Sequence, residues 1–177
     1  YASDDGVNHS HDRLQDARLE DYSARVENIY LPKLDFLCTS IRETQDMNIG
    51  DISISDFGCG AGHFVCAAKK RGIKAQGFEV SKELINHAST SFHKLYGANC
   101  SNPFHLVPDE AELLEKMISS NANVVSFIGV LEHLRHPLRF FEAFKSSQSK
   151  YLYLSVPLFS LSCMIENVFA SVYPRHL

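Results

Sequence analysis

Hydrophobic residues in this chain occur in short runs that alternate with longer segments of helical periodicity. Residues 52–57 alternate apolar and small polar side chains and begin with β-branched isoleucines, which predicts a strand. Further strands are predicted at 74–80, 104–107, 123–128 and 151–156. The run 123–128 is almost continuously apolar, as expected of a strand that helices cover on both faces. Strands that alternate with helices predict an α/β fold with a mainly parallel sheet.

The segments between these strands carry the start and stop signals of helices. The first ends at Gly72, directly after three cationic residues that suit the end of a helix. Ser81 is placed to cap a helix that runs to about Tyr96. Two more helices are predicted to begin near Asp109 and at Pro137.

The flanks of the strand region are also helical in pattern. Residues 13–41 have helical periodicity interrupted by Pro32, so we expect two helices, the second opening at Pro32. Residues 158–177 form an amphipathic stretch that fits a substrate lid, a membrane-facing helix or an ordinary core helix. Membrane contact is the least favoured of the three, because this stretch carries Glu166 and few cations.

Composition narrows the class of protein. The chain has 177 residues, of which 45% are hydrophobic and 21% charged, enough for one domain with a sizeable core. No apolar run is long enough to span a membrane, and the start of the chain is polar rather than a signal sequence. The net charge of −4 argues against a nucleic-acid partner. The five cysteines form an odd set without C-x-x-C, which predicts a reducing, cytoplasmic location rather than disulfides or a zinc site.

A glycine-rich turn follows the first predicted strand, with the pattern D-x-G-x-G-x-G at 56–62. Glycines allow a ligand to lie against the backbone, and the free N–H groups at the next helix start face its anionic part. The dinucleotide pattern G-x-G-x-x-G fails, because its third glycine position holds His63 in one frame and Val65 in the other. No P-loop triplet occurs either. Glu79, at the end of the second predicted strand, is placed to accept hydrogen bonds from both ribose hydroxyls of a nucleoside on this turn.

Three segments together carry a family resemblance: DFGCGAGHF at 56–64, GFEVS at 77–81 and VVSFIGVLEHL at 124–134. They resemble the class I S-adenosylmethionine-dependent methyltransferases, most closely the small-molecule group that includes the ubiquinone-biosynthesis enzymes. The resemblance is firm over residues 50–157 and loose in the flanks. It implies a Rossmann-like, doubly wound sheet of strand order 3-2-1-4-5 preceded by N-terminal helices. It also implies S-adenosyl-L-methionine as cofactor and S-adenosyl-L-homocysteine as product.

The chain departs from that family at its end. The family sheet has seven strands, whereas only five are predicted here, so strands six and seven are missing and strand five is left as an apolar edge. We therefore expect this chain to be part of a longer protein. We predict one methyltransferase domain over 1–177, with cap helices at 1–49, a cofactor-binding core at 50–157 and a helical lid at 158–177. The oligomeric state is not readable from the sequence, although a bare edge favours pairing.

The resemblance also implies which residues bind the cofactor. They are Asp56, Gly58, Cys59, Gly60, Gly62, Glu79, Val80, Asp109, Gly129 and Val130. Within this set Asp56 faces the amino-acid end, Glu79 the ribose and Asp109 the adenine. An aspartate at a helix start is equally explained by the helix dipole, and Cys59 is first of all a small residue that fills space.

His133 is the candidate catalytic residue, as a base that removes the proton of a hydroxyl acceptor. The other interpretation, which we favour, is that Glu132 and His133 hydrogen-bond the loop and the next helix start. No metal site is expected at His133 and His136, because Pro137 breaks the helix register and no nearby acid or cysteine completes a ligand set. The leading helices either cover the cofactor, with Tyr22 and Tyr30 as lid residues, or only cap the sheet.

These expectations combine into a methyltransferase acting on an oxygen, nitrogen or carbon nucleophile of a small molecule such as a quinone, sugar or lipid precursor. The alternative is a cofactor-binding but non-catalytic relative that serves as a scaffold or partner subunit. A nicotinamide-dependent enzyme is disfavoured by the absent third glycine.

Overall fold

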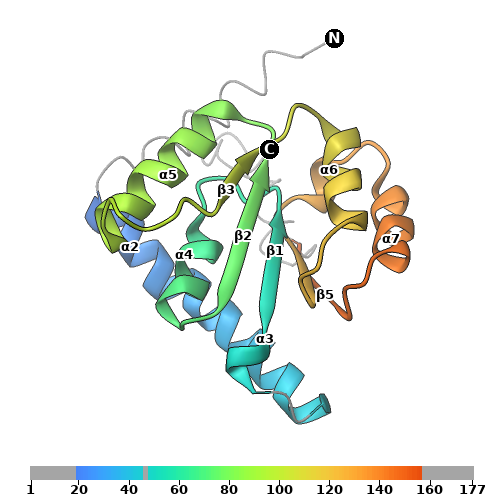
Figure 1. The fold of residues 1–177 in the computed structure, drawn as a ribbon, viewed down its shortest axis with the longest axis horizontal. Coiled ribbons are helices and arrows are strands. Elements are labelled where there is room, and N and C mark those ends of the chain that lie inside the picture. The colour runs from blue at the N-terminus through green and yellow to red at the C-terminus, as the bar shows by residue number, and fades with distance from the viewer. Residues whose placement is uncertain (1–18, 46–47, 157–177) are drawn as a thin grey trace, which may run out of the picture.

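The structure is a computed structural model that describes residues 19–45 and 48–156. Its centre is a sheet of five parallel strands in the order β3-β2-β1-β4-β5 (Figure 1). The predicted α/β class, Rossmann-like sheet and order 3-2-1-4-5 are confirmed. The strands are β1 Ser53–Phe57, β2 Lys74–Glu79, β3 Phe104–Leu106, β4 Val124–Ile128 and β5 Tyr151–Ser155.

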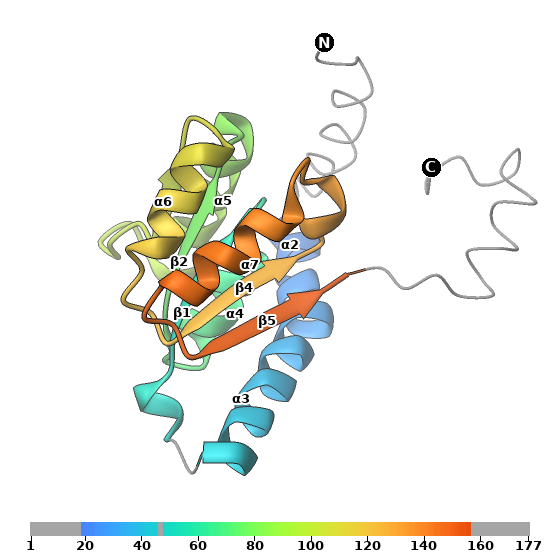
Figure 2. The same ribbon diagram turned by 90° about the vertical axis from the view of Figure 1, so that its right-hand side faces the viewer.

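Helices cover both faces of the sheet. Figures 1 and 2 show α6 and α7 on one face, with α3, α4 and α5 on the other. Ser81 caps α5, since its hydroxyl accepts a hydrogen bond from the N–H of Leu84, and Pro137 is the first residue of α7. The helical elements are α2 Leu19–Arg25, η1 Val26–Tyr30, α3 Leu31–Gln45, η2 Ile49–Asp51, α4 His63–Lys70, α5 Lys82–Tyr96, α6 Glu110–Ile118, η3 Leu131–His133 and α7 Pro137–Ser146.

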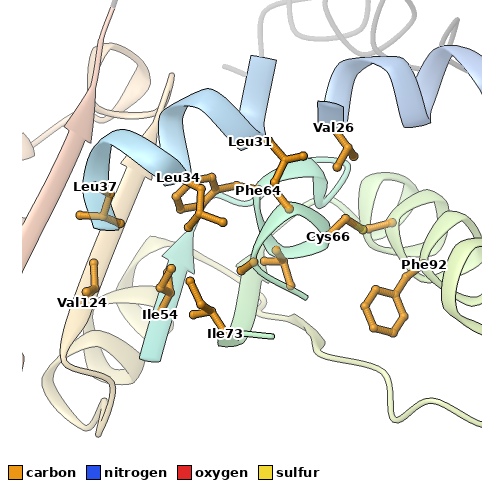
Figure 3. Packing of buried hydrophobic residues seen from close by; sticks show 14 of the residues in the cluster. Val26, Leu31, Leu34, Leu37, Ile54, Phe64, Cys66, Ile73, Phe92 and Val124 are labelled. Carbon is orange, nitrogen blue, oxygen red and sulfur yellow. The ribbon is translucent and has the colours of Figure 1, made fainter. Parts of the chain in front are cut away.

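Alternate side chains of the central strands divide the core into two layers. Ile54 and Val124 belong to the layer beneath α3 and α4, where Leu34 and Phe64 also pack (Figure 3). Their neighbours on the other sheet face, including Phe127, pack with Phe140 of α7. The sheet is therefore fixed from both sides, and the ends of its strands are rigid places from which to hold a ligand.

In the cap segment, residues 19–45, α3 begins at Leu31, one residue before the predicted opening at Pro32, but the predicted interruption is absent. The chain does not break there but stays helical, because a π turn, η1, joins α2 directly to α3. The N–H of Leu31 bonds to the carbonyl of Val26, five residues back. This wider turn accommodates a proline, which has no N–H to donate and whose ring crowds the carbonyl four residues before it.

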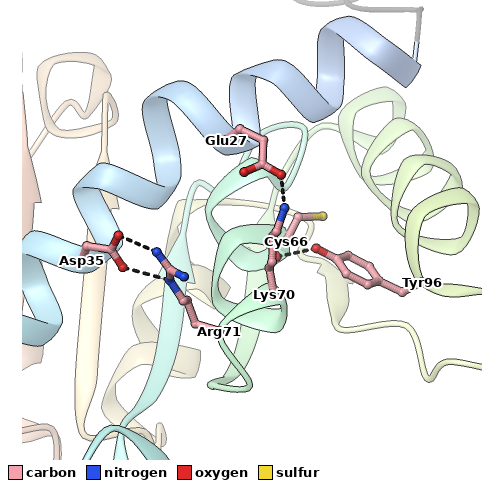
Figure 4. Close-up of polar contacts among 6 residues, drawn as sticks. All are labelled: Glu27, Asp35, Cys66, Lys70, Arg71 and Tyr96. Atoms are coloured by element: carbon pink, nitrogen blue, oxygen red, sulfur yellow. Dashed lines mark hydrogen bonds and ion pairs between the residues drawn. The ribbon is translucent and has the colours of Figure 1, made fainter.

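The basic residues at the end of α4 hold the cap segment against the core (Figure 4). Lys70 pairs with Glu27, and Arg71 binds Asp35 through two hydrogen bonds of 2.9 and 2.7 Å. We expected these cations to suit the end of a helix, where they compensate its dipole, and the structure adds a packing role. All four side chains are exposed, so each pair contributes little to stability.

Several predictions lie outside the described residues. The lid helix at 158–177, Cys163 and the start of the first cap helix at 13–18 belong to this group. Within the described ranges β5 is an edge strand that pairs only with β4. In the same ranges no helix has the length and apolarity that a membrane crossing requires.

Candidate functional site

A cavity of about 1300 Å³ opens at the carboxyl ends of the strands. Its walls come from the turn after β1, the ends of β2 and β5, the start of α6, the segment after β4 and the cap segment. Ligands bind at this edge of open α/β sheets, where the strand order reverses between β1 and β4. The volume exceeds the roughly 300–1,000 Å³ of an ordinary ligand pocket.

The glycines of the turn have different functions. Gly60 has a φ of +54°, a Cβ built on it would meet nothing within 4 Å, and it lines the cavity. Gly62 has a φ of +79°, but a Cβ there would lie 2.5 Å from the ring of Phe104, and the residue does not line the cavity. Gly60 therefore gives a ligand access to bare backbone, whereas Gly62 lets α4 begin close to β3. Gly58 does line the cavity and packs against Val130.

Glu79 lines the cavity and is tied to the turn by hydrogen bonds. Its Oε2 accepts from the N–H of Gly60 at 2.9 Å, and its Oε1 accepts from the N–H groups of Val80 and Ser81 at 2.8 and 3.0 Å. A carboxylate has about four acceptor positions, so about one remains for a ligand. The residue expected to bind both ribose hydroxyls thus also fixes the glycine turn, and it keeps an acceptor position for about one of the two hydroxyls.

Asp56 lies beneath the turn rather than in the cavity wall. Its side chain accepts a hydrogen bond of 2.7 Å from the hydroxyl of Ser126 on the neighbouring strand, and the residue is 2% exposed. Its pKa is raised to about 7, mainly because the buried carboxyl has lost its hydration; the hydrogen bond from Ser126 opposes this, and the charge of Glu79 adds to it.

Cys59 lines the cavity and fills the space above β2. A Cβ on Gly77 would lie 2.6 Å from its Sγ, so the two small residues fit together. Burial raises the pKa of the Cys59 thiol well above its ordinary value, and the charges of Asp56 and Glu79 add to the rise. The side chain is therefore uncharged and fills space here, in keeping with its small size.

The remaining predicted residues come together at the same cavity. Val80, Asp109, Gly129, Val130 and His133 all line it. Asp109 is also the N-cap of α6, where its Oδ1 accepts from the N–H of Glu112 at 2.9 Å. Both explanations of this aspartate are thus compatible with its position.

His133 sits on η3 with an exposed side chain that faces the cavity. Within residues 19–45 and 48–156 no hydrogen bond is made by the side chains of His133 or Glu132. The favoured interpretation, loop stabilisation by these side chains, therefore lacks the contacts it requires in this part of the chain. The same residues contain no trio of His, Cys, Asp or Glu side chains arranged to hold a metal ion.

The contact between the cap segment and the start of α4 involves residues that sequence reasoning missed or underrated. His63, at the start of α4, is stacked between Tyr22 and Tyr30, with ring centroids 4.2 and 5.1 Å away. Tyr22 is fully buried and donates a 2.7 Å hydrogen bond to the carbonyl of Ala61 in the glycine turn. Burial lowers the pKa of His63 to about 3, and nearby Arg25 lowers it too. His63 is thus a neutral ring that fixes the cap segment over the turn.

Two cations of the cap segment, Arg25 and Lys33, also line the cavity. They face a wall that carries Glu79, Glu83, Asp109 and Glu110 on the β2 and β3 side. The cavity therefore has an acidic side and a basic side. The sequence did not indicate that these two cations line a cavity, because single charged residues on a helix are most often solvated.

The sequence matches a protein family described as a methyltransferase domain over residues 25–170. The chain belongs to this family. The match spans the cap segment from Arg25 and the whole described sheet, so the methyltransferase domain includes every wall of the cavity. The expected membership of the class I S-adenosylmethionine-dependent methyltransferases is confirmed at the level of family and fold, whereas the ubiquinone-biosynthesis subgroup stays a prediction.

Solved structures share the fold of this methyltransferase domain at low sequence identity. Magnesium protoporphyrin IX methyltransferase from Synechocystis PCC 6803, crystallised with S-adenosylhomocysteine, has a TM-score of 0.61 at 15% identity, covering 98% of this chain and 77% of its own. A putative S-adenosylmethionine-dependent methyltransferase from Methanococcus maripaludis has a TM-score of 0.52 at 13% identity, covering 88% and 71%. No curated protein matches the sequence.

The domain spans a smaller share of some other similar structures. It covers 58% of a methyltransferase from Archaeoglobus fulgidus and 49% of the E. coli protein YjhP. The activity, substrate and partners of the whole protein are therefore matters for a proposal.

Proposed function

We propose that the protein is an S-adenosylmethionine-dependent methyltransferase that methylates an oxygen, nitrogen or carbon nucleophile of a small molecule. The observation that supports this most strongly is the pairing of the glycine turn with Glu79 at the cavity. Gly60 leaves backbone open to a ligand there, and the carboxylate of Glu79 is held within hydrogen-bond distance of that backbone. A nucleoside lying on the turn would have beside it a carboxylate that can accept a hydrogen bond from a ribose hydroxyl.

The proposed contacts follow from which residues line the cavity. Glu79 and Val80 would hold the ribose, Asp109 the adenine, and Gly58, Cys59 and Gly60 the backbone-facing side. Gly129 and Val130, after β4, would flank the methionine portion. Asp56 and Gly62 would act from below, the first through its hydrogen bond with Ser126 on the neighbouring strand and the second by allowing α4 to begin where it does.

S-adenosylmethionine supplies a methyl group that is already activated on a sulfonium, so little covalent chemistry is left to the protein. Its residues would align the acceptor with that methyl group and keep water out. The cap segment fits this task, because Tyr22 and Tyr30 fix it over the turn through His63. His133, which lines the cavity from η3, would take the proton of the acceptor if that acceptor is a hydroxyl.

The non-catalytic alternative predicts cofactor binding with no turnover on any small acceptor. The volume of about 1300 Å³ favours an enzyme, because it exceeds what one ligand of cofactor size needs. A quinone, a sugar or a lipid precursor would each fit a space of this size. A small acceptor molecule and a cytoplasmic location remain parts of the proposal.

The test is calorimetry with S-adenosylhomocysteine and NAD side by side. We expect S-adenosylhomocysteine alone to bind, and Glu79→Gln to weaken it about tenfold or more, since a hydrogen bond to a charged group contributes about 1.5–3 kcal/mol. Glu115→Gln, an exposed acid on α6, is the matched control and should leave the affinity unchanged. Equal affinity of the wild type and Glu79→Gln would contradict the proposed cofactor site. Labelled donor, the full-length protein and a metabolite extract then separate an enzyme from a scaffold.

A further inference from the structure

Lys33 places a positive charge in the cavity wall. It belongs to the first turn of α3, is half-buried and lines the cavity. Its Nζ donates a 2.9 Å hydrogen bond to the hydroxyl of Ser155 and lies 5.7 Å from the ring centre of Tyr30. Among the described residues it forms no ion pair with a carboxylate, although four acids line the other side of the same cavity.

A half-buried ammonium held by a neutral hydroxyl and an aromatic ring has lost part of its hydration. Burial accordingly lowers the pKa of Lys33. Other charged residues of the cap segment do have partners of opposite charge, since Glu27 and Asp35 each pair with a cation at the end of α4. A charge left unpaired at a cavity wall is suited to a ligand of the opposite sign, which replaces the lost hydration.

The position of Lys33 separates it from the proposed cofactor contacts. Ser155 ends β5, where its carbonyl accepts a 2.7 Å hydrogen bond from the N–H of Gly129. β5 lies two strands from β1, whose carboxyl end carries the glycine turn, and strands are about 4.8 Å apart. The ammonium therefore lies about 10 Å across the sheet from that turn, beyond the strand that would flank the donor methyl group. This is the side left for the acceptor.

We infer that the acceptor carries an oxyanion, a carboxylate or a phosphate, which Lys33 and Ser155 bind at the end of β5. The inference rests on the proposed function and narrows its substrate class to anionic small molecules. Arg25, on the same cap segment, also lines the cavity. The acidic side would repel the same group, so the two sides together orient the acceptor.

The test uses the full chain saturated with S-adenosylhomocysteine and titrated with benzoate, phenyl phosphate and the neutral benzamide, followed by NMR. We expect one or both anions to bind at millimolar concentrations, with benzamide weaker. The anion that binds better distinguishes a carboxylate from a phosphate acceptor. Lys33→Met, which keeps the apolar stem, should weaken anion binding about tenfold or more, and Lys33→Arg should retain it. Lys145→Met removes an exposed lysine of α7 as the matched control, and thermal unfolding checks that each variant is folded.

Three results would overturn the inference while leaving the proposed function intact. They are equal binding of benzamide and the anions, no anion binding by the wild type, or unchanged anion binding in Lys33→Met. A fourth would reassign the lysine to the cofactor. In that case Lys33→Met weakens S-adenosylhomocysteine but leaves 5′-methylthioadenosine, which lacks the amino-acid end, unaffected. Failure of the wild type to bind S-adenosylhomocysteine would instead refute the proposed function itself.

Discussion

Replacing Asp56 by asparagine should change how the stability of the domain depends on pH. Asp56 is buried beneath the glycine turn, and its pKa is raised from the ordinary value of 3.8 to about 7. Between these two values the native state holds a proton that the unfolded state has released. The free energy of unfolding therefore falls as pH rises through this window. The substitution Asp56→Asn keeps a side-chain oxygen for the hydroxyl of Ser126 but removes the group that ionises.

The size of the effect follows from the pKa values. A rise from 3.8 to about 7 corresponds to about 4 kcal/mol in favour of the protonated native state, because each pKa unit is about 1.4 kcal/mol. At about pH 5 the carboxyl of the unfolded state is already mostly ionised, so part of this free energy has already been lost from the stability of the native state. Between about pH 5 and about pH 8 the wild type should lose about 2 to 3 kcal/mol relative to Asp56→Asn.

Urea denaturation of both proteins at several pH values and constant ionic strength measures this difference. Other titrating groups contribute equally to both curves, so only the gap between them matters. Asp51→Asn, which removes an exposed aspartate of η2, is the matched control and should follow the wild type. Parallel curves for the wild type and Asp56→Asn would refute the reasoning, because Asp56 would then ionise alike in the native and unfolded states.

Three further changes test other parts of the structure. His63→Phe should reduce the loss of stability in acid, measured by urea denaturation between about pH 6.5 and about pH 4, because the pKa of His63 is lowered to about 3 and the native state must stay unprotonated. Gly60→Ala and Gly72→Ala should each lower the free energy of unfolding by about 1 to 2 kcal/mol, since both glycines have positive φ and open space around them. Calorimetry should show that only Gly60→Ala weakens the binding of S-adenosylhomocysteine, because only Gly60 lines the cavity. A double-mutant cycle of Asp35→Asn and Arg71→Met should give a small coupling free energy that shrinks with added salt. A large, salt-independent coupling would contradict the exposed position of this pair.

The strands and the acidic side of the cavity could be predicted because their signals are local. Each strand begins and ends within one residue of its predicted boundary, since each predicted run is followed by a glycine, a proline or a capping residue. Glu79 and the glycine turn follow from the rule that parallel strands place their carboxyl ends at one edge. Helix caps such as Ser81 depend only on residues three positions away.

The basic side could not be predicted because its contacts join distant parts of the chain. Lys33 meets Ser155 across 122 residues, and Tyr22 reaches Ala61 across 39. The sequence pattern also could not predict that Asp56 and Gly62 lie beneath the cavity, since D-x-G-x-G-x-G does not say which of its residues face outward. That distinction depends on the path of the turn and on the ring of Phe104, which comes from a different strand.

The π turn in the cap segment has a consequence for how this domain tolerates changes in length. In a regular α-helix, Tyr22 and Tyr30 would lie about 80° apart around the axis, and the wider turn between them absorbs part of that angle so that both rings reach His63. Deleting one residue from η1 would rotate α2 by about 100° and draw it in by about 1.5 Å, while α3 stays docked on the sheet. The loss or gain of one residue in η1 would therefore rotate α2 about its axis and leave the Rossmann-like core unchanged.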